Sequence, residues 1–197
     1  LMKVLSGVYL KDEGEIIYEG KPVEIRNIQD ARKLGISIIH QELNMLAERN
    51  IAQNIYLGRE PLKNPYTRQI DEKKMREDSK ALLARLGVEL SPDTMVKDLS
   101  IAQQQMVEVV KALSVETKIL IMDEPTKGID VGAKAEIYTI MGELAQQGMA
   151  IVLISSDMSE LCAMSDRCLV LSNGKITGEF VGEDITQENV MRAAIAS

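Results

Sequence analysis

Two adjacent carboxylates, Asp123 and Glu124, directly follow the apolar run 119–122 and are the residues of this chain best suited to chemistry. Four apolar residues without polar alternation predict a strand buried on both faces, as in a parallel α/β sheet. The acids then stand at the carboxyl end of that strand, where open α/β sheets bind their ligands. Carboxylates in this place can hold Mg²⁺ and polarise an attacking water in phosphoryl transfer. The alternative is a strand end closed by two solvated acids.

Two other polar positions adjoin predicted elements. Gln41 follows the apolar segment 36–39, and its alternative is an exposed side chain after a strand. Ser100 precedes the predicted helix 102–115, and a helix N-terminus attracts anions because its first N–H groups are unpaired. Ser100 can equally be a simple N-cap, and the two roles are compatible. The single histidine, His40, is expected to be a loop residue rather than a catalytic base.

The pattern along the chain predicts strands that alternate with helices around the acidic strand. Predicted strands occupy 15–18, 23–25, 36–39, 119–122, 149–154, 167–171 and 175–180, and predicted helices occupy 1–5, 28–33, 71–86, 102–115, 133–147, 159–164 and 188–194. Asn173-Gly174 predicts a tight hairpin turn. No convincing strand occurs between about 44 and 115, so this stretch is interpreted as a helical insertion. Such alternation favours a parallel sheet flanked by helices.

Composition argues against several classes of protein. The net charge of −7 and the pI near 4.9 disfavour a nucleic-acid-binding surface. The apolar runs are too short to cross a bilayer, because a spanning helix needs about 20 consecutive apolar residues, and no signal peptide is visible. Cys162 and Cys168 form no metal-ligand pattern and are expected to be reduced. We therefore expect a cytosolic globular chain.

Four short motifs occur in a definite order: Gln41 after a strand, Leu99-Ser-Ile-Ala-Gln-Gln-Gln105 at a helix start, Asp123-Glu124-Pro125-Thr126, and Gly128-Ile-Asp130. Together they resemble the nucleotide-binding subunit of an ABC transporter, and the resemblance covers the whole chain. Three more segments are similar to the double-cassette ATPases of bacterial ribose and galactose importers: His40-Gln-Glu-Leu43, Asn54-Ile-Tyr-Leu-Gly-Arg-Glu60 and Val131-Gly-Ala-Lys134. The implied fold is α/β, a P-loop NTPase with a RecA-like parallel sheet and a helical subdomain.

The resemblance implies a role for each motif. Asp123 would hold Mg²⁺ and Glu124 would polarise the attacking water, so ATP and Mg²⁺ are the implied cofactors. Gln41 would sense the γ-phosphate and Mg²⁺ and would link the cassette to the transmembrane permease subunits. Asp130 would lie at the interface with a second cassette. Ser156 would stand in place of the family's switch histidine, where it can hydrogen-bond phosphate but cannot supply an imidazole's charge.

The signature loop is implied to begin at Ser100 and to include Ile101, Ala102 and Gln103, where it would contact ATP held by the opposite cassette. The commoner family pattern has two glycines in place of Ile101 and Ala102. Side chains at these positions allow a less close approach of the backbone to a phosphate. The implied partners are the permease subunits and either a second cassette or another copy of this chain, with no nucleic acid.

One part of the expected phosphate site is missing from the 197 residues. No Gly-x-x-x-x-Gly-Lys-Ser/Thr loop (Walker A) occurs, and the first seven residues resemble the helix that follows this loop in the family. We expect one incomplete nucleotide-binding domain without the P-loop strand, with 1–43 and 116–197 as its core and 44–115 as its helical subdomain. Because no loop cradles the phosphates, we expect negligible ATPase activity from this chain alone.

The two ends of the chain resemble different cassettes. Residues 1 to about 115 resemble the first cassette of the double-cassette subunits and 127–197 resemble the second, which suggests a fusion across the shared Asp-Glu-Pro-Thr. The edges left by a missing strand favour a homodimer or a strand-exchanged assembly. The leading function is the ATP-binding subunit, or a fragment of it, of a monosaccharide importer on the inner face of the cell membrane. The alternatives are an inactive fragment that acts only by association and, disfavoured by the pI, an ABC-type ATPase of DNA repair or translation.

Overall fold

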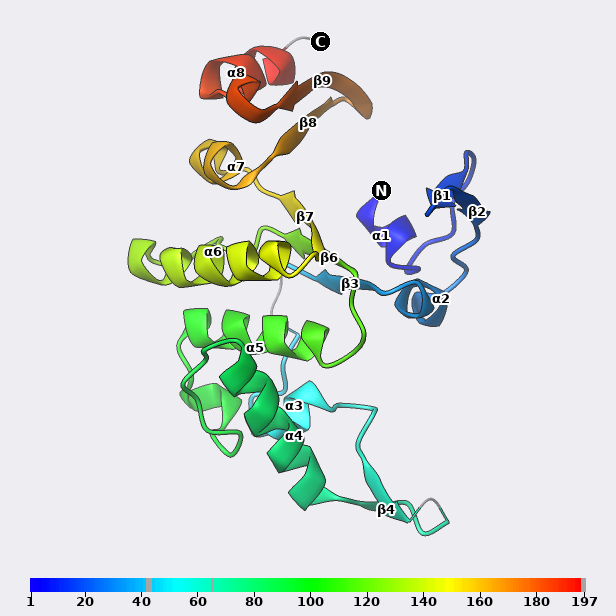
Figure 1. The fold of residues 1–197 in the computed structure, drawn as a ribbon, viewed down its shortest axis with the longest axis vertical. Coiled ribbons are helices and arrows are strands. Elements are labelled where there is room, and N and C mark those ends of the chain that lie inside the picture. Colours follow the sequence, from blue (N-terminus) through cyan, green and yellow to red (C-terminus); the bar gives the residue numbers. More distant parts are fainter. Residues whose placement is uncertain (42–43, 65, 196–197) are drawn as a thin grey trace. The chain divides into compact units, whose positions relative to one another are not determined.

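The structure, a computed structural model, describes residues 1–41, 44–64 and 66–195 (Figure 1). The chain forms two compact units, Leu1–Val152 and Leu153–Ser197. The boundary falls inside strand β7 (Ala150–Ile154), so the polypeptide passes from one unit to the other within a strand rather than through a linker.

The central sheet has three strands in the order β3-β6-β7. Strands β3 (Ile36–Ile39) and β6 (Ile119–Asp123) are parallel, with Ile36 opposite Ile119 and Ile39 opposite Met122. The inner residues of β6 are fully buried, as a run without polar alternation predicts. The predicted α/β architecture with a parallel sheet is therefore confirmed.

Two long helices of the first unit, α5 (Ile101–Leu113) and α6 (Val131–Gln146), pack against each other, and α5 also packs against β3. Their apolar residues recur at helical spacing and are buried: Met106, Val107, Val109 and Val110 on α5, and Ile137, Ile140, Met141 and Leu144 on α6. The end of α5 is attached to the start of β3. The Ser37 and Thr117 hydroxyl oxygens lie 2.9 Å apart, and the Thr117 hydroxyl donates to the Ala112 carbonyl oxygen at 2.8 Å.

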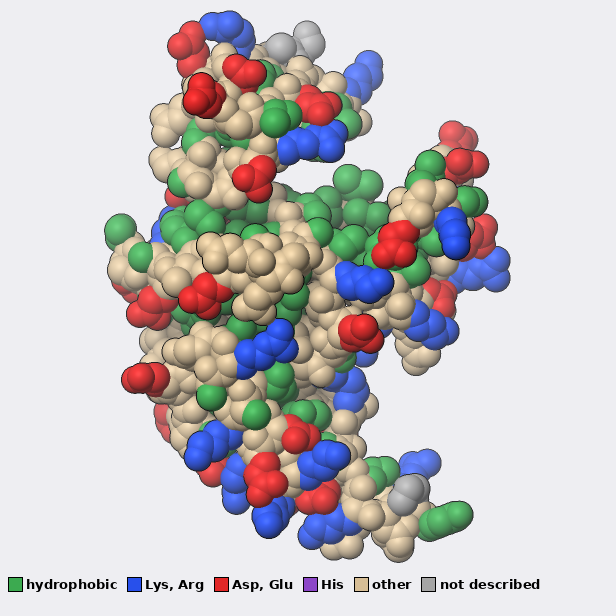
Figure 2. All heavy atoms as spheres, viewed as in Figure 1, with side chains coloured by type: hydrophobic (Ala, Val, Ile, Leu, Met, Phe, Trp, Pro, Cys, Tyr) green, Lys and Arg blue, Asp and Glu red, His purple; other side chains and the backbone are tan. Residues whose placement is uncertain are grey.

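Residues between β3 and α5 are mainly helical. Helices α3 (Ile51–Ile55) and α4 (Glu72–Arg85) pack against each other and against α5, and a 3-10 turn (Val96–Asp98) leads into α5. The Asp71 carboxylate caps α4 by accepting a hydrogen bond from the backbone N–H of Lys74 at 3.1 Å. Acidic and basic side chains are interspersed on the face of this region that Figure 2 shows. The other predicted helices are all present, with ends shifted by at most about two residues.

A short antiparallel pair of strands, β4 (Leu62–Asn64) and β5 (Gln69–Ile70), interrupts this helical region. The sequence predicted no strand here, and that prediction was wrong. Every residue of the pair is exposed, so the two strands bury no apolar face. Without a buried face they leave no alternating pattern by which the sequence could have revealed them.

The N-terminal part contains a hairpin of β1 (Ile16–Tyr18) and β2 (Lys21–Val23). The sequence placed the second strand at 23–25, but it begins two residues earlier. The turn residues Glu19 and Gly20 have φ of 49° and 75°, as in a two-residue hairpin turn, and such a turn sets Lys21 directly opposite Tyr18.

Helices α1 (Met2–Leu5) and α2 (Ile28–Lys33) approach each other closely at Gly7. Gly7 has a φ of 74°, and an ideal Cβ on it would lie only 2.2 Å from the Asn27 carbonyl oxygen. The position therefore requires glycine for two separate reasons, its backbone conformation and the space around it.

The second unit contains α7 (Met158–Met164), the strands β8 (Arg167–Ser172) and β9 (Lys175–Val181), and α8 (Gln187–Ile195). The strands form the predicted hairpin around Asn173-Gly174, whose φ values are 48° and 76°. Its buried cluster consists of Cys168, Val170, Ile185, Val190 and Ala193. Both cysteines are free. Across the described ranges, no helix combines the length and the apolar character needed to span a bilayer.

Candidate functional site

Gln41, Asp123 and Glu124 lie at the carboxyl edge of the parallel sheet. Because Ile39 is paired with Met122, the chain leaves β3 and β6 at one edge, with Gln41 after the first strand and Asp123 and Glu124 at the end of the second. The two acids are half-buried and Gln41 is exposed. This edge therefore presents two carboxylates and one carboxamide to a ligand.

Glu124 has a rare backbone conformation for a residue with a side chain. Its φ is 51°, in the left-handed region that costs an L residue about 1–2 kcal/mol. The strand has ended there, and the chain turns so that the Lys127 N–H donates to the Glu124 carbonyl oxygen at 3.2 Å. Residues in such conformations persist where their surroundings fix them, and they gather at functional sites. A fixed turn, rather than a continued strand, sets the direction of the Glu124 side chain.

Ser100 is the N-cap of α5 and forms a complete capping box with Gln103. The Ser100 hydroxyl accepts from the Gln103 backbone N–H at 3.2 Å, and the Gln103 side-chain oxygen accepts from the Ser100 N–H at 3.0 Å. Ile101 is exposed and Ala102 is half-buried. The backbone N–H groups of these two residues have no acceptor within the helix, so this end of α5 can receive an anion.

Ser100 lies at the opposite end of α5 from the contact between this helix and the start of β3. Ala112, near the C-terminal end of α5, is attached to the start of β3. Ser100 lies twelve positions earlier in the sequence, which is about 18 Å of helix at 1.5 Å per residue. Gln41, Asp123 and Glu124 follow the ends of two neighbouring strands, whereas Ser100 begins a separate helix.

Asp130 and Ser156 precede the next two helices of the chain. The Asp130 carboxylate caps α6 by accepting from the Ala133 N–H at 3.1 Å, and it is exposed. Ser156 belongs to the second unit and is exposed in the turn between β7 and α7. In the same turn the Ser155 hydroxyl accepts from the Asp157 N–H at 3.0 Å, and Asp157 caps α7.

The residues at the sheet edge fit Mg²⁺ when a phosphate completes the site. Carboxylate and amide oxygens are hard ligands of the kind this ion prefers, and Mg²⁺ is usually held by one or two carboxylates together with substrate phosphates. The described residues contain no group of three acidic, histidine or cysteine side chains that could hold a metal unaided. Asp123, Glu124 and Gln41 are the side chains that would take part.

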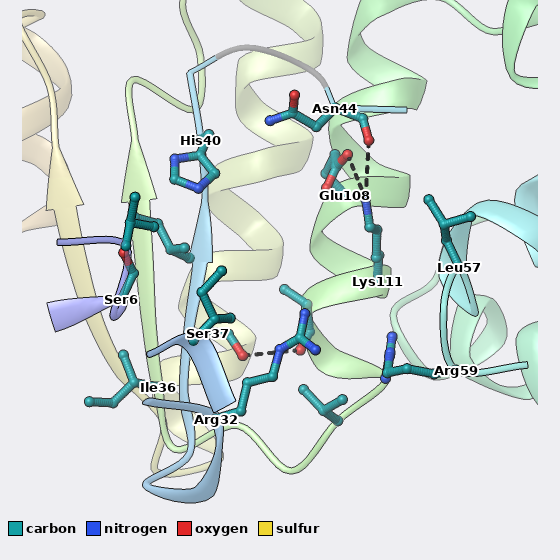
Figure 3. Close-up of a pocket in the computed structure, with 15 residues that line it drawn as sticks. Ser6, Arg32, Ile36, Ser37, His40, Asn44, Leu57, Arg59, Glu108 and Lys111 are labelled. Carbon is teal, nitrogen blue, oxygen red and sulfur yellow. Dashed lines mark hydrogen bonds and ion pairs between the residues drawn. The ribbon is translucent and has the colours of Figure 1, made fainter. Parts of the chain in front are cut away.

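A second feature is a pocket of about 230 Å³ between β3, α2, α5 and the residues that follow α3 (Figure 3). Sequence reasoning did not find it. His40, the single histidine, lines it at the end of β3, and Ser37 and Asn44 also contribute. The only sequence signal was a pair of opposite charges at helical spacing, Glu108 and Lys111, which line one wall.

The pocket is basic. Lys111 donates to Glu108 at 3.2 Å and to the Asn44 carbonyl oxygen at 3.3 Å. The Arg59 guanidinium donates to the Ile55 carbonyl oxygen at 2.8 Å and to the Ser114 hydroxyl at 2.7 Å. Burial lowers the pKa of Arg59, and the positive charge of Arg32 on the opposite wall lowers it further. An acidic group entering the pocket would relieve this repulsion.

A parallel sheet with acids at its carboxyl edge and a helix that begins at a serine N-cap are features found in nucleotide-binding α/β proteins. The sequence model of the ABC transporter family matches residues 1–127, and the chain belongs to this family.

Two similar proteins are named as ATP-binding proteins of sugar import. A putative ribose/galactose/methyl galactoside import ATP-binding protein 3 of Burkholderia ambifaria is 47% identical over 175 residues, which cover 89% of this chain and 34% of the relative. The ribose import ATP-binding protein of Caldanaerobacter subterraneus is 38% identical and covers 99% of this chain and 39% of the relative. The chain thus spans roughly a third to two fifths of the length of these relatives.

Solved structures of the same family have the same fold. The crystal structure of a nucleotide-free ATP-binding cassette from an ABC transporter matches with a TM-score of 0.83 and 25% identity, over 97% of this chain and 78% of that chain. The fold is therefore that of an ABC ATPase cassette, as the motifs predicted.

Proposed function

We propose that this chain is a nucleotide-binding cassette, or part of one, that works with membrane permease subunits to import a monosaccharide at the inner face of the cell membrane. The main support is the register of β3 and β6, which sets Gln41 beside the Asp123-Glu124 pair at one sheet edge. The names of the relatives support sugar import, since they are ribose and galactose import ATP-binding proteins.

The sheet-edge residues have separate roles in this proposal. When bound, Mg²⁺ supplies charge that stabilises the transferring phosphoryl group. Asp123 holds the ion, Glu124 polarises the attacking water, and Gln41 contacts the γ-phosphate side of the site. Ser156, exposed in the second unit, is the residue to which the family resemblance assigns a hydrogen bond to phosphate.

Ser100 acts on a different nucleotide from the one at this sheet edge. In the family this loop contacts ATP held by the opposite cassette, and the first N–H groups of α5 are available to an anion. The proposed complex therefore contains two cassettes, and each Ser100 contacts the nucleotide held by the other. Asp130, exposed at the start of α6, lies at the same interface.

The 197 residues contain no Walker A loop, so a complete site needs a loop that these residues do not supply. The chain alone is expected to bind ATP weakly and to hydrolyse it negligibly, because positioning of the phosphates provides most of the catalysis. Joining a segment that contains the loop to the N-terminus of this chain should give Mg²⁺-dependent ATPase activity that Asp123→Asn abolishes. Asp12→Asn, an exposed acid far along the chain from the site, is the matched control.

The basic pocket is the proposed docking surface for an acidic cytoplasmic segment of the permease. Arg32, Arg59 and Lys111 supply the complementary charge. Arg59→Glu should reduce co-purification with permease subunits, and Arg85→Glu, an exposed change at the end of α4, should not. Equal binding by both variants would exclude this surface.

The second candidate function is association without catalysis, favoured by the pocket because it needs no Walker A loop. The experiment with the added loop separates the two functions. An ATPase rate that Asp123→Asn leaves unchanged, combined with normal permease binding, would favour association alone.

A further inference from the structure

We infer that Asn54 is a positioning residue that fixes the Ser100 end of α5 to the segment following Gln41. The inference rests on the proposed function for its biological meaning, because Ser100 matters only where it contacts a nucleotide. Its structural part rests on the hydrogen bonds of Asn54 alone.

Asn54 lies on α3 and is completely buried, with an exposed fraction of 0%. Its side-chain oxygen accepts from the Leu46 N–H at 2.7 Å. Its side-chain nitrogen donates to the carbonyl oxygens of Leu46 at 3.1 Å, Asn50 at 3.0 Å and Arg49 at 3.4 Å. One carboxamide thus holds the whole turn 46–50, and buried polar groups of this kind are costly to leave unpaired.

Hydrogen bonds also join residues 46–50 to the residues that precede Ser100. The Val96 N–H donates to the Arg49 carbonyl oxygen at 3.0 Å, and the Lys97 N–H donates to the Ala47 carbonyl oxygen at 3.1 Å. The Lys97 ammonium also lies 2.9 Å from the Glu48 carboxylate. These bonds connect segments about 50 residues apart in the sequence, a distance that only tertiary structure can bridge.

Every residue from Val96 to the capping box at Ser100 belongs to a hydrogen-bonded turn or helix. The 3-10 turn Val96–Asp98 is followed by Leu99, which is buried and accepts at its carbonyl oxygen from the Gln104 side chain at 3.1 Å. Ser100 comes next. The turn 46–50 therefore holds Ser100 through a short, continuously bonded path, and Asn54 is the side chain that keeps the turn closed.

Helix α3, which carries Asn54, also leads to the basic pocket. Leu57 and Arg59, which follow α3, line one wall, and the Asn44 carbonyl oxygen binds Lys111 in another. The pocket and the Ser100 end of α5 are thus attached to one element. A ligand that moves residues 44–59 is expected to move Ser100 with them.

Amide hydrogen exchange of the chain without nucleotide tests the inference. In Asn54→Leu, which has similar size but no polar group, exchange at Val96, Lys97 and Gln103 should rise by about tenfold or more, while α6 stays as in the wild type. Leu144→Ala, a buried change in α6, is the control for general loss of stability and should raise exchange in α6 first.

Asn54→Ser keeps one donor and one acceptor and should show the same pattern with a smaller rise. An equal rise in α6 and in residues 96–103 for both Asn54 variants would overturn the inference, because Asn54 would then be only a general stabiliser. An unchanged rate at residues 96–103 would overturn it too. Both outcomes are independent of ATP.

A second readout connects the inference to function. With the loop-containing segment joined to the chain, Asn54→Leu should raise the KM for ATP more than it lowers kcat, since Ser100 contributes to nucleotide binding. If the wild-type chain with this segment has no ATPase activity, the proposed function fails, yet the exchange pattern still decides the role of Asn54.

Discussion

Ser79 offers a direct test of the packing within the helical region. It lies on α4 with an exposed fraction of 0%, and its hydroxyl has no hydrogen-bond partner among the described residues. A buried hydroxyl without a partner costs about 1–3 kcal/mol on the scale of protein mutations. Replacing it by a methyl group should therefore stabilise the protein.

The magnitude of Ser79→Ala can be worked out from three contributions. Removing the unpaired hydroxyl contributes about 1–3 kcal/mol, and the better helix propensity of alanine adds a few tenths of a kcal/mol. Loss of the van der Waals contacts of one oxygen atom offsets about 0.5–1 kcal/mol. The net gain is about 0.3–3 kcal/mol. For a chain of this size each kcal/mol raises Tm by about 2–4 °C, so we expect a rise of about 1–12 °C.

Urea unfolding followed by circular dichroism measures the change. Lys80→Ala, the exposed neighbour on the same helix, changes propensity without changing burial and should shift stability by no more than about 0.5 kcal/mol. A Ser79→Ala protein that is less stable than the wild type would refute the reasoning, because it would mean that the hydroxyl has a partner in solution.

Three further predictions concern other parts of the chain. Gly7→Ala should lower the free energy of unfolding in urea by more than the conformational strain of about 1–2 kcal/mol. Gly14→Ala, at a similar φ of 84° but in open space, should cost only that strain. Equal losses would exclude a steric clash between a Cβ at position 7 and its neighbours. Burial raises the pKa of Cys168, so it should react with iodoacetamide more slowly than Cys162 and only at higher pH, as mass spectrometry of the two peptides would reveal. Ser100→Ala should lower stability by about 1 kcal/mol through loss of the cap, and an unchanged midpoint in urea would contradict that.

Local signals predicted the sheet edge and the caps well. The apolar run before Asp123 marked β6 because a strand buried on both faces has no polar alternation. Ser100 was placed before its helix because serine is a preferred N-cap residue, and the structure adds the capping box with Gln103. The Asn173-Gly174 turn was predicted because both residues tolerate positive φ.

Features that depend on distant contacts could not be predicted. Asn54 resembles any polar residue of a helix, and only the folded chain shows that four hydrogen bonds end on it. Likewise, Arg32 and Arg59 belong to separate segments, so their shared pocket exists only in tertiary structure. The strands β4 and β5 were not predicted, because alternation of apolar and polar residues indicates a buried face and these exposed strands have none.

The left-handed backbone at Glu124 implies a trade-off between stability and activity. Glycine would relax this φ of 51°, so Glu124→Gly should recover part of about 1–2 kcal/mol while it removes the carboxylate that the proposed chemistry needs. Random mutation selected only for thermal stability would therefore be expected to discard this side chain. Selection for the proposed activity would retain it, and a less stable protein would be the consequence.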